Sequence, residues 1–236
     1  INIQCSRRHG GRIQTDITFV DLLDRVERLL DKGCKSVGFV SPSHYFPQTL
    51  GIIQGLKERG RNPVFVYNTN GYDRVEAIQR LENVIDVYLP DFKYMDETVG
   101  RTVSRAPDYP RIAAAAIGEM YRQMGPDIEL DDDGLITRGL IIRHLVLPGQ
   151  VQNSIDVLRY IAQNFSPDCH ISLMSQYWPT PAVADHPTLG RRITEEEYDL
   201  VLEALEDLGF HRGWVQELES SDHYRPDFMR DHPFDP

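Results

Sequence analysis

Short apolar runs alternate with amphipathic segments along almost the whole chain, and this alternation constrains the fold more than any other feature. Each apolar run has the length of a strand buried on both faces, and each amphipathic segment has apolar residues at helical spacing. The predicted strands are 36–40, 63–67, 85–89, 140–147, 170–174 and, as a short last one, 213–216. The predicted helices are 18–30, 47–59, 73–81, 109–124, 154–165 and 194–208.

Buried strands that are separated by helices form a parallel sheet with right-handed crossovers. About six such units predict an α/β fold built as a partial (βα)6 barrel, and an open doubly wound sheet is the competing architecture. Helix-end signals agree, since Thr18 can cap the first helix, and Thr194 and Glu197 have the spacing of a capping box. We expect one domain over residues 1–219 and a surface tail over 220–236, which is rich in Asp, His and Pro.

Composition limits the classes of partner. The chain has 36 acidic and 25 basic residues, a net charge of −11, which argues against a broad nucleic-acid-binding face. No apolar run approaches the roughly 18 residues of a membrane span, and no charged-then-apolar leader opens the chain. The chain begins at Ile1 and not at Met.

Cysteine use indicates the compartment. The three cysteines, Cys5, Cys34 and Cys169, are far apart in the sequence and odd in number, so they form no disulfide framework. This pattern suits a reducing cytoplasm, and it also provides no closely spaced metal motif. Cys34 and Cys169 lie beside apolar strands and are expected to be small core residues.

Polar residues gather where the apolar runs end. In either parallel architecture, ligands bind at the carboxyl ends of the strands. The residues found there supply hydroxyls, amides, a carboxylate and two cations, which together suit an amino-acid-like or carboxylate ligand. The candidates are Ser43, His44, Asn68, Thr69, Asn70, Asp91, Lys93, Arg143, Gln176 and Tyr177.

Each group also has a plainer interpretation. The segment 68–71 ends in Asn-Gly, a common turn pair, and Asp91 with Lys93 could form a surface ion pair. Arg143 interrupts an apolar run, so it needs either a structural salt bridge or an anionic ligand. A metal-dependent hydrolase using His44, His144 and Asp91 is a further alternative, although these three do not share a ligand motif.

The same strand ends resemble a known family. The similarity covers about residues 18–234, and the segments are specific in combination. They are FVSPSH (39–44), VYNTNGY (66–72), YLPDFK (88–93), RHLVLPG (143–149) and RGWVQEL (212–218). The chain resembles radical S-adenosylmethionine (SAM) proteins homologous to pyruvate formate-lyase activating enzyme, in particular an uncharacterised iron–sulfur branch of that group.

The resemblance implies a [4Fe–4S] cluster held by a Cys-x3-Cys-x2-Cys loop, since thiolates are the ligands that such clusters use. The chain has no such motif. We therefore expect the family's first strand and cluster loop to be absent from the chain, with the cluster ligands upstream of Ile1 and no metal ligand within it.

The resemblance also assigns roles to the candidates. It places Lys93 against the SAM carboxylate and Arg143 in the SAM site. Asn68, Thr69 and Asp91, with the neighbouring Asn70, fall near the methionine part, where activating enzymes can also hold a monovalent cation; Asn68 replaces their Asp. Ser43 or His44 stands where the family has a carboxylate for the SAM amino group. Gln176 or Tyr177 lies where activating enzymes have a ribose-contacting His.

The implied function is a cytoplasmic radical SAM enzyme, inactive as this fragment, that cleaves SAM reductively to a 5′-deoxyadenosyl radical for hydrogen abstraction. Its substrate is either a glycyl-radical protein or a small molecule, and its electron donor a protein such as flavodoxin or ferredoxin. Neither nucleic acid nor membrane is an expected partner. The alternative is a SAM- or nucleotide-binding relic without a cluster. A Cys-x3-Cys-x2-Cys motif upstream of Ile1 in the natural gene would separate the two. The catalytic residue stays unassigned.

Overall fold

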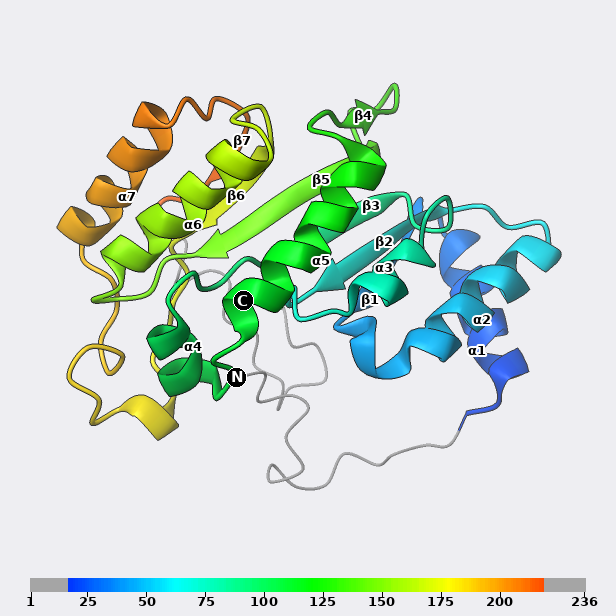
Figure 1. The fold of residues 1–236 in the computed structure, drawn as a ribbon. Helices are drawn as coiled ribbons and strands as arrows, with labels where there is room; N and C mark the ends of the chain where they lie inside the picture. Colours follow the sequence, from blue (N-terminus) through cyan, green and yellow to red (C-terminus); the bar gives the residue numbers. More distant parts are fainter. Residues whose placement is uncertain (1–16, 219–236) are drawn as a thin grey trace.

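The predicted alternation of strands and helices is confirmed by the computed structural model, which describes residues 17–218 (Figure 1). The α-helices are α1 (Phe19–Leu30), α2 (Phe46–Glu58), α3 (Val75–Gln79), α4 (Glu97–Ser104), α5 (Tyr109–Met124), α6 (Val151–Asn164) and α7 (Glu195–Asp207). The strands are β1 (Ser36–Val40), β2 (Val64–Thr69), β3 (Val87–Pro90), β4 (Glu129–Leu130), β5 (Ile136–Leu145), β6 (His170–Met174) and β7 (Gly213–Val215). Two short 3-10 helices are η2 (Pro42–Tyr45) and η3 (Pro181–Val183).

The sheet decides between the two predicted architectures. Its order is β1-β2-β3-β5-β6-β7 with all neighbours parallel, and β4 pairs antiparallel with β5. Because the strands follow one another without a reversal, right-handed crossovers put every connecting helix on the same face. A doubly wound sheet requires a reversal of strand order. The fold is therefore a partial barrel, and among residues 17–218 its sheet stays open, with β1 and β7 at its edges.

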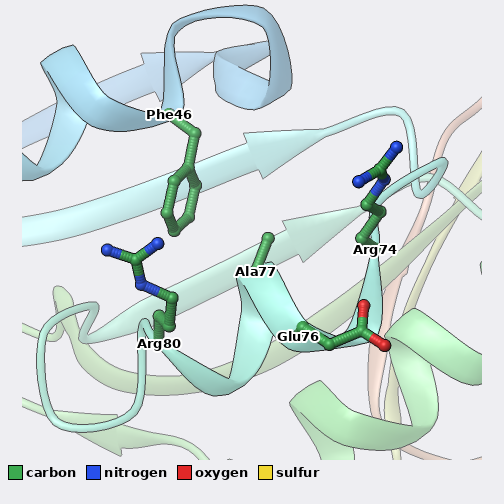
Figure 2. A pocket seen from close by; sticks show the side chains of 5 residues that line it. All are labelled: Phe46, Arg74, Glu76, Ala77 and Arg80. Carbon is green, nitrogen blue, oxygen red and sulfur yellow. The ribbon is translucent and has the colours of Figure 1, made fainter.

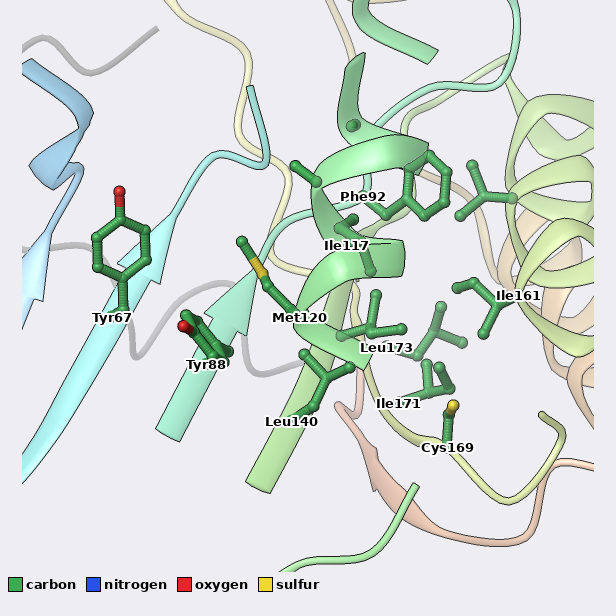
Figure 3. Packing of buried hydrophobic residues seen from close by; sticks show 14 of the residues in the cluster. Tyr67, Tyr88, Phe92, Ile117, Met120, Leu140, Ile161, Cys169, Ile171 and Leu173 are labelled. Atoms are coloured by element: carbon green, nitrogen blue, oxygen red, sulfur yellow. The ribbon is translucent and has the colours of Figure 1, made fainter. Parts of the chain in front are cut away.

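The core lies between this sheet and its helices. Figure 3 shows Ile117 and Met120 of α5 against Tyr88 and Leu140 of the sheet, and all four are buried. Cys169 belongs to this core, as predicted, and burial raises the pKa of its thiol to about 11. The prediction for the other cysteine of the described range is wrong, because Cys34 is exposed in the loop before β1.

Three local features differ from the predictions. The helix α4 was not predicted, because Gly100 and the β-branched residues around it have low helix propensity; the Asp96 side chain caps it by accepting from the Thr98 and Val99 N–H groups. The hairpin of β4 and β5 around the turn 131–134 was also missed. Finally, β2 continues to Thr69, so part of the predicted exit turn is strand. The predicted tail over 220–236 lies outside the described residues.

Glu197 fastens the start of α7 to two loops. Its Oε1 accepts from the Gly149 N–H at 2.7 Å, and its two oxygens pair with the Arg191 guanidinium, each at 2.7 Å. With Thr194 it completes the predicted capping box. The Arg191 guanidinium is the main cause that lowers the pKa of Glu197, from 4.5 to about 2.

We expect this network to make stability depend on pH. A carboxylate whose folded-state pKa is lowered stabilises the fold fully above its unfolded pKa, and the contribution is lost as pH falls. Glu197→Gln should therefore be less stable than the wild type at pH 7, by about 2 kcal/mol. The difference should shrink between pH 4.5 and pH 2. Urea denaturation across this range measures it, and Glu203→Gln, an exposed change on the same helix, is the control. A difference that is constant with pH would contradict the assignment.

Candidate functional site

Four predicted residues meet at the carboxyl ends of β2, β3 and β5. Arg143 Nη2 donates to Asn68 Oδ1 at 2.7 Å and lies 2.6 Å from Asp91 Oδ1. Lys93 Nζ donates to the other Asp91 oxygen at 2.5 Å. The Asp91 side chain is only 16% exposed and that of Lys93 32%, so this is not a pair on the open surface. We refer to Asn68, Asp91, Lys93 and Arg143 as the strand-end cluster.

The strand-end cluster is electrostatically incomplete. It holds two cations and one carboxylate. Arg143 Nη2 is within ion-pair distance of Asp91 Oδ1. Asp91 Oδ1 and Arg143 Nε are nevertheless both buried without a hydrogen-bond partner in the described part of the chain. Unpaired buried donors are costly and are usually satisfied by a ligand or by water. The cluster can therefore accept one further anionic group, such as a carboxylate.

A buried tyrosine on α5 positions the backbone of the site. The Tyr109 hydroxyl lies 2.8 Å from the Asn70 carbonyl oxygen and 2.7 Å from the Asp91 carbonyl oxygen, and it accepts from the Lys93 N–H at 3.0 Å. The two loops approach so closely that a Cβ on Gly71, whose φ is +78°, would lie 2.3 Å from the Asp91 carbonyl oxygen. Only glycine fits there.

A buried amide on α6 fixes the next turn of the same loop. Asn153 Oδ1 accepts from the Met95 N–H at 2.9 Å, and its Nδ2 donates to the Lys93 carbonyl oxygen at 3.1 Å. Neither Tyr109 nor Asn153 was predicted. Each supports the Lys93 backbone from a helix, where no strand-end pattern marks it.

A second group of polar side chains surrounds Asp73. Its carboxylate is buried and accepts from the hydroxyls of Ser43 at 2.6 Å, Tyr67 at 3.0 Å and Thr69 at 2.5 Å. Burial and the Asp73 charge raise the pKa of Tyr67 above its ordinary value. Thr69 Oγ1 also accepts from the Gly71 N–H at 3.2 Å. Asp73 was predicted only as the first residue of a helix, and its position after an Asn-Gly turn was the sole signal in the sequence.

The remaining candidates lie apart from the strand-end cluster. His44 is exposed on η2, and Asn70 is exposed, its side chain accepting from the Tyr72 N–H. Gln176 Oε1 is 3.4 Å from Gln216 Nε2, and the Tyr177 hydroxyl donates to the Leu189 carbonyl oxygen at 2.7 Å. These contacts run toward β7 and the loop before α7. The ligand roles of these four residues stay predictions.

His144 points away from the strand-end cluster into the core. Its Nδ1 lies 2.7 Å from the Phe92 carbonyl oxygen and its Nε2 2.9 Å from Ser154 Oγ. Both ring nitrogens are used, and burial lowers the pKa of His144 to about 4. Within residues 17–218 no three His, Cys, Asp or Glu side chains are grouped as metal ligands. This arrangement gives no support to the hydrolase alternative.

We expect His144 to stay neutral across the physiological range. An NMR titration should find its ring resonances constant from pH 8 to pH 5, with a transition near pH 4, because burial disfavours the imidazolium. The exposed His44 is the internal comparison in the same spectra. A transition of His144 near pH 6.5 would show that its ring is accessible to water.

The contribution of the Tyr109 hydroxyl can be measured as a change in the free energy of unfolding. Tyr109→Phe removes the hydroxyl that forms hydrogen bonds with two backbone carbonyl oxygens and one backbone N–H around the site. The free energy of unfolding should fall by about 1–3 kcal/mol, the usual range for buried backbone groups left unpaired. Tyr121→Phe is the matched control, because that hydroxyl has no hydrogen bond among the described residues. Equal losses in the two variants, measured in urea, would argue against the positioning role.

The cavity of about 630 Å³ shown in Figure 2 is lined by no residue of the strand-end cluster. Its walls are Phe46, Arg74, Glu76, Ala77 and Arg80, none of which was a predicted site residue. The strand-end cluster is instead an open edge of the sheet. No helix among residues 17–218 is long and apolar enough for a membrane span.

Comparisons with known proteins found one sequence relative and a solved structure with a similar fold. No protein-family model matches the chain. The uncharacterised protein MJ0674 of Methanocaldococcus jannaschii is 30% identical over 173 residues, which are 73% of this chain and 46% of that protein. The chain thus spans less than half the length of this curated relative. A crystal structure of a domain of pyruvate-formate lyase-activating enzyme from Bacteroides vulgatus matches with a TM-score of 0.54 and 17% identity. The match covers 77% of this chain and 98% of that domain, and it establishes the fold.

Proposed function

We propose that the chain is the SAM-binding part of a radical SAM enzyme resembling pyruvate formate-lyase activating enzymes. The observation that carries the proposal is the strand-end cluster, which has a surplus cation and an unpaired buried donor at the edge where parallel α/β folds bind ligands. The fold shared with a domain of an activating enzyme supports the same class.

The SAM carboxylate would lie against Lys93 and Arg143. Lys93 uses one of its three donors on Asp91, so two remain, and Arg143 Nε is buried without a partner. Asp91 keeps both cations in place before a ligand arrives, which lowers the ordering cost of binding. The Ser43 hydroxyl donates to Asp73, so its oxygen can still accept a hydrogen bond from a donor such as an amino group.

A [4Fe–4S] cluster, when bound, supplies the electron that cleaves SAM in this enzyme class. The described residues do not fit such a cluster, because Cys34 is exposed in a loop, Cys169 is buried in the core, and no three-ligand group occurs in residues 17–218. The role proposed for this chain is therefore limited to holding and orienting SAM.

The substrate and partners follow from the same proposal. Hydrogen abstraction would act on a glycyl-radical protein or on a small molecule, with a flavodoxin- or ferredoxin-like electron donor in the cytoplasm. The alternative is a SAM- or nucleotide-binding relic without a cluster. A Cys-x3-Cys-x2-Cys motif encoded upstream of Ile1 in the natural gene would exclude the relic.

Lys93→Ala tests the proposed site. Removing a charge-assisted hydrogen bond in a partly buried site costs on the order of 1.5–3 kcal/mol, so SAM affinity should fall roughly tenfold to a hundredfold. Lys93→Arg should restore it only in part, because a planar guanidinium presents its donors differently. Titration calorimetry of SAM measures both, and Lys32→Ala, an exposed change after α1, is the control. Unchanged affinity in a folded Lys93→Ala would leave Lys93 as no more than an ion-pair partner of Asp91.

A further inference from the structure

The guanidinium of Arg143 lies between two side-chain oxygens that come from neighbouring strands. Its Nη2 is 2.7 Å from Asn68 Oδ1, near the end of β2, and 2.6 Å from Asp91 Oδ1, directly after β3. One positively charged group therefore meets both oxygens. The resemblance to activating enzymes implies a monovalent cation beside the same residues, so the arrangement found here decides whether such an ion fits.

The side chains of the strand-end cluster do not fit a monovalent cation. Asn68 Oδ1 already accepts from Arg143. Each oxygen of Asp91 faces a positive group, because Lys93 Nζ lies 2.5 Å from Oδ2 and Arg143 lies beside Oδ1. A metal cation at this place would have two fixed positive charges and one carboxylate around it, and like charges at such short range repel strongly in a partly buried site.

Asn68 sets the charge of the cluster. A guanidinium has only donors, so the atom of the Asn68 amide that faces Arg143 must be the oxygen, and the amide Nδ2 is a further donor. With this neutral amide, the two cations of the cluster face one carboxylate, and one positive charge is in surplus. A carboxylate at position 68 would cancel the surplus and would supply a second anionic ligand for a metal cation.

The backbone holds these residues together independently of any ligand. The Asp91 N–H donates to the Thr69 carbonyl oxygen at 2.9 Å, which joins the ends of β2 and β3. The Phe92 N–H donates to the Arg143 carbonyl oxygen, also at 2.9 Å, which joins the end of β3 to β5. The guanidinium is therefore placed by the sheet beside both oxygens, and the cost of ordering the site on binding is low.

We propose that the Arg143 guanidinium is the built-in cation of this site, and that Asn68 makes the site bind a carboxylate ligand without a metal ion. The donors that remain on Lys93 and the unpaired Arg143 Nε are the groups that meet the ligand carboxylate. This inference rests on the proposed SAM site, and it names the residue that determines the charge of that site.

The first experiment uses no SAM. The NMR relaxation rate of the sodium nucleus is measured with each folded variant at equal ionic strength. The wild type and Asn68→Ala should give the same rate, because no ion uses the Asn68 oxygen. Asn68→Asp with Arg143→Gln supplies two carboxylates and removes the guanidinium, so it should increase the rate. The matched control is Asn83→Asp with Arg25→Gln, which makes the same change of charge at exposed positions.

The second experiment is titration calorimetry of SAM. The Kd of the wild type should differ by less than about twofold between sodium chloride and choline chloride at equal ionic strength. Asn68→Asp should raise Kd roughly tenfold to a hundredfold, because the new carboxylate repels that of the ligand. Asn68→Ala keeps the surplus charge and should raise Kd by less than about fivefold. Asn83→Asp, in the exposed turn before β3, should alter Kd by less than about twofold.

Three results would overturn the proposal. The first is faster sodium relaxation with the wild type than with Asn68→Ala. The second is an equal relaxation rate for the two folded double variants. The third is unchanged SAM affinity in Asn68→Asp. A wild type that does not bind SAM at all would contradict the proposed function instead, and the sodium measurements would still decide the role of Arg143.

Discussion

The Asp91 carboxylate is the interaction on which the site depends. It lies at the end of β3 between the ammonium of Lys93 and the guanidinium of Arg143, and it joins β3 to β5 where the backbone bridge between them ends. One carboxylate cannot neutralise two cations, so they repel each other across a partly buried edge. A second anion relieves this repulsion, and the local dielectric makes the gain larger than in water. The surplus charge therefore adds little to the stability of the fold.

The order of the strands explains why this edge is open. Because consecutive strands are neighbours, all the crossover helices lie on one face, and they bury Phe65 and Tyr67 of β2. The alternate residues Val66 and Asn68 point to the other face and are only half-buried. Val40 on the edge strand β1 is 68% exposed. A barrel uses this concave face as its interior, so the strand-end cluster borders a surface that the helices of residues 17–218 leave uncovered.

The sequence was sufficient for the parts of the site that follow from strand geometry. Parallel strands end at one edge, so Asn68, Asp91 and Arg143 could be brought together from three apolar runs alone. The residues that support this site could not be predicted in the same way, because Asn153 contacts the Lys93 loop from 60 positions away along the chain. Asp73 was located correctly near a strand end, but its role could not be predicted from the sequence. Its position in the sequence resembles a helix start, and only the folded structure shows that three hydroxyls surround its buried carboxylate.

Asp73 also fixes the chain between β2 and α3. Its side chain is held on three sides by hydroxyls from η2 and β2, so the backbone at residue 73 has little freedom. Arg74, the next residue, is the N-cap of α3, so that helix starts from a fixed point. The segment before Asp73 also borders the strand-end cluster, because the Tyr109 hydroxyl contacts the carbonyl oxygens of both Asn70 and Asp91. The buried Asp73 carboxylate therefore resists a movement of the chain that borders the site.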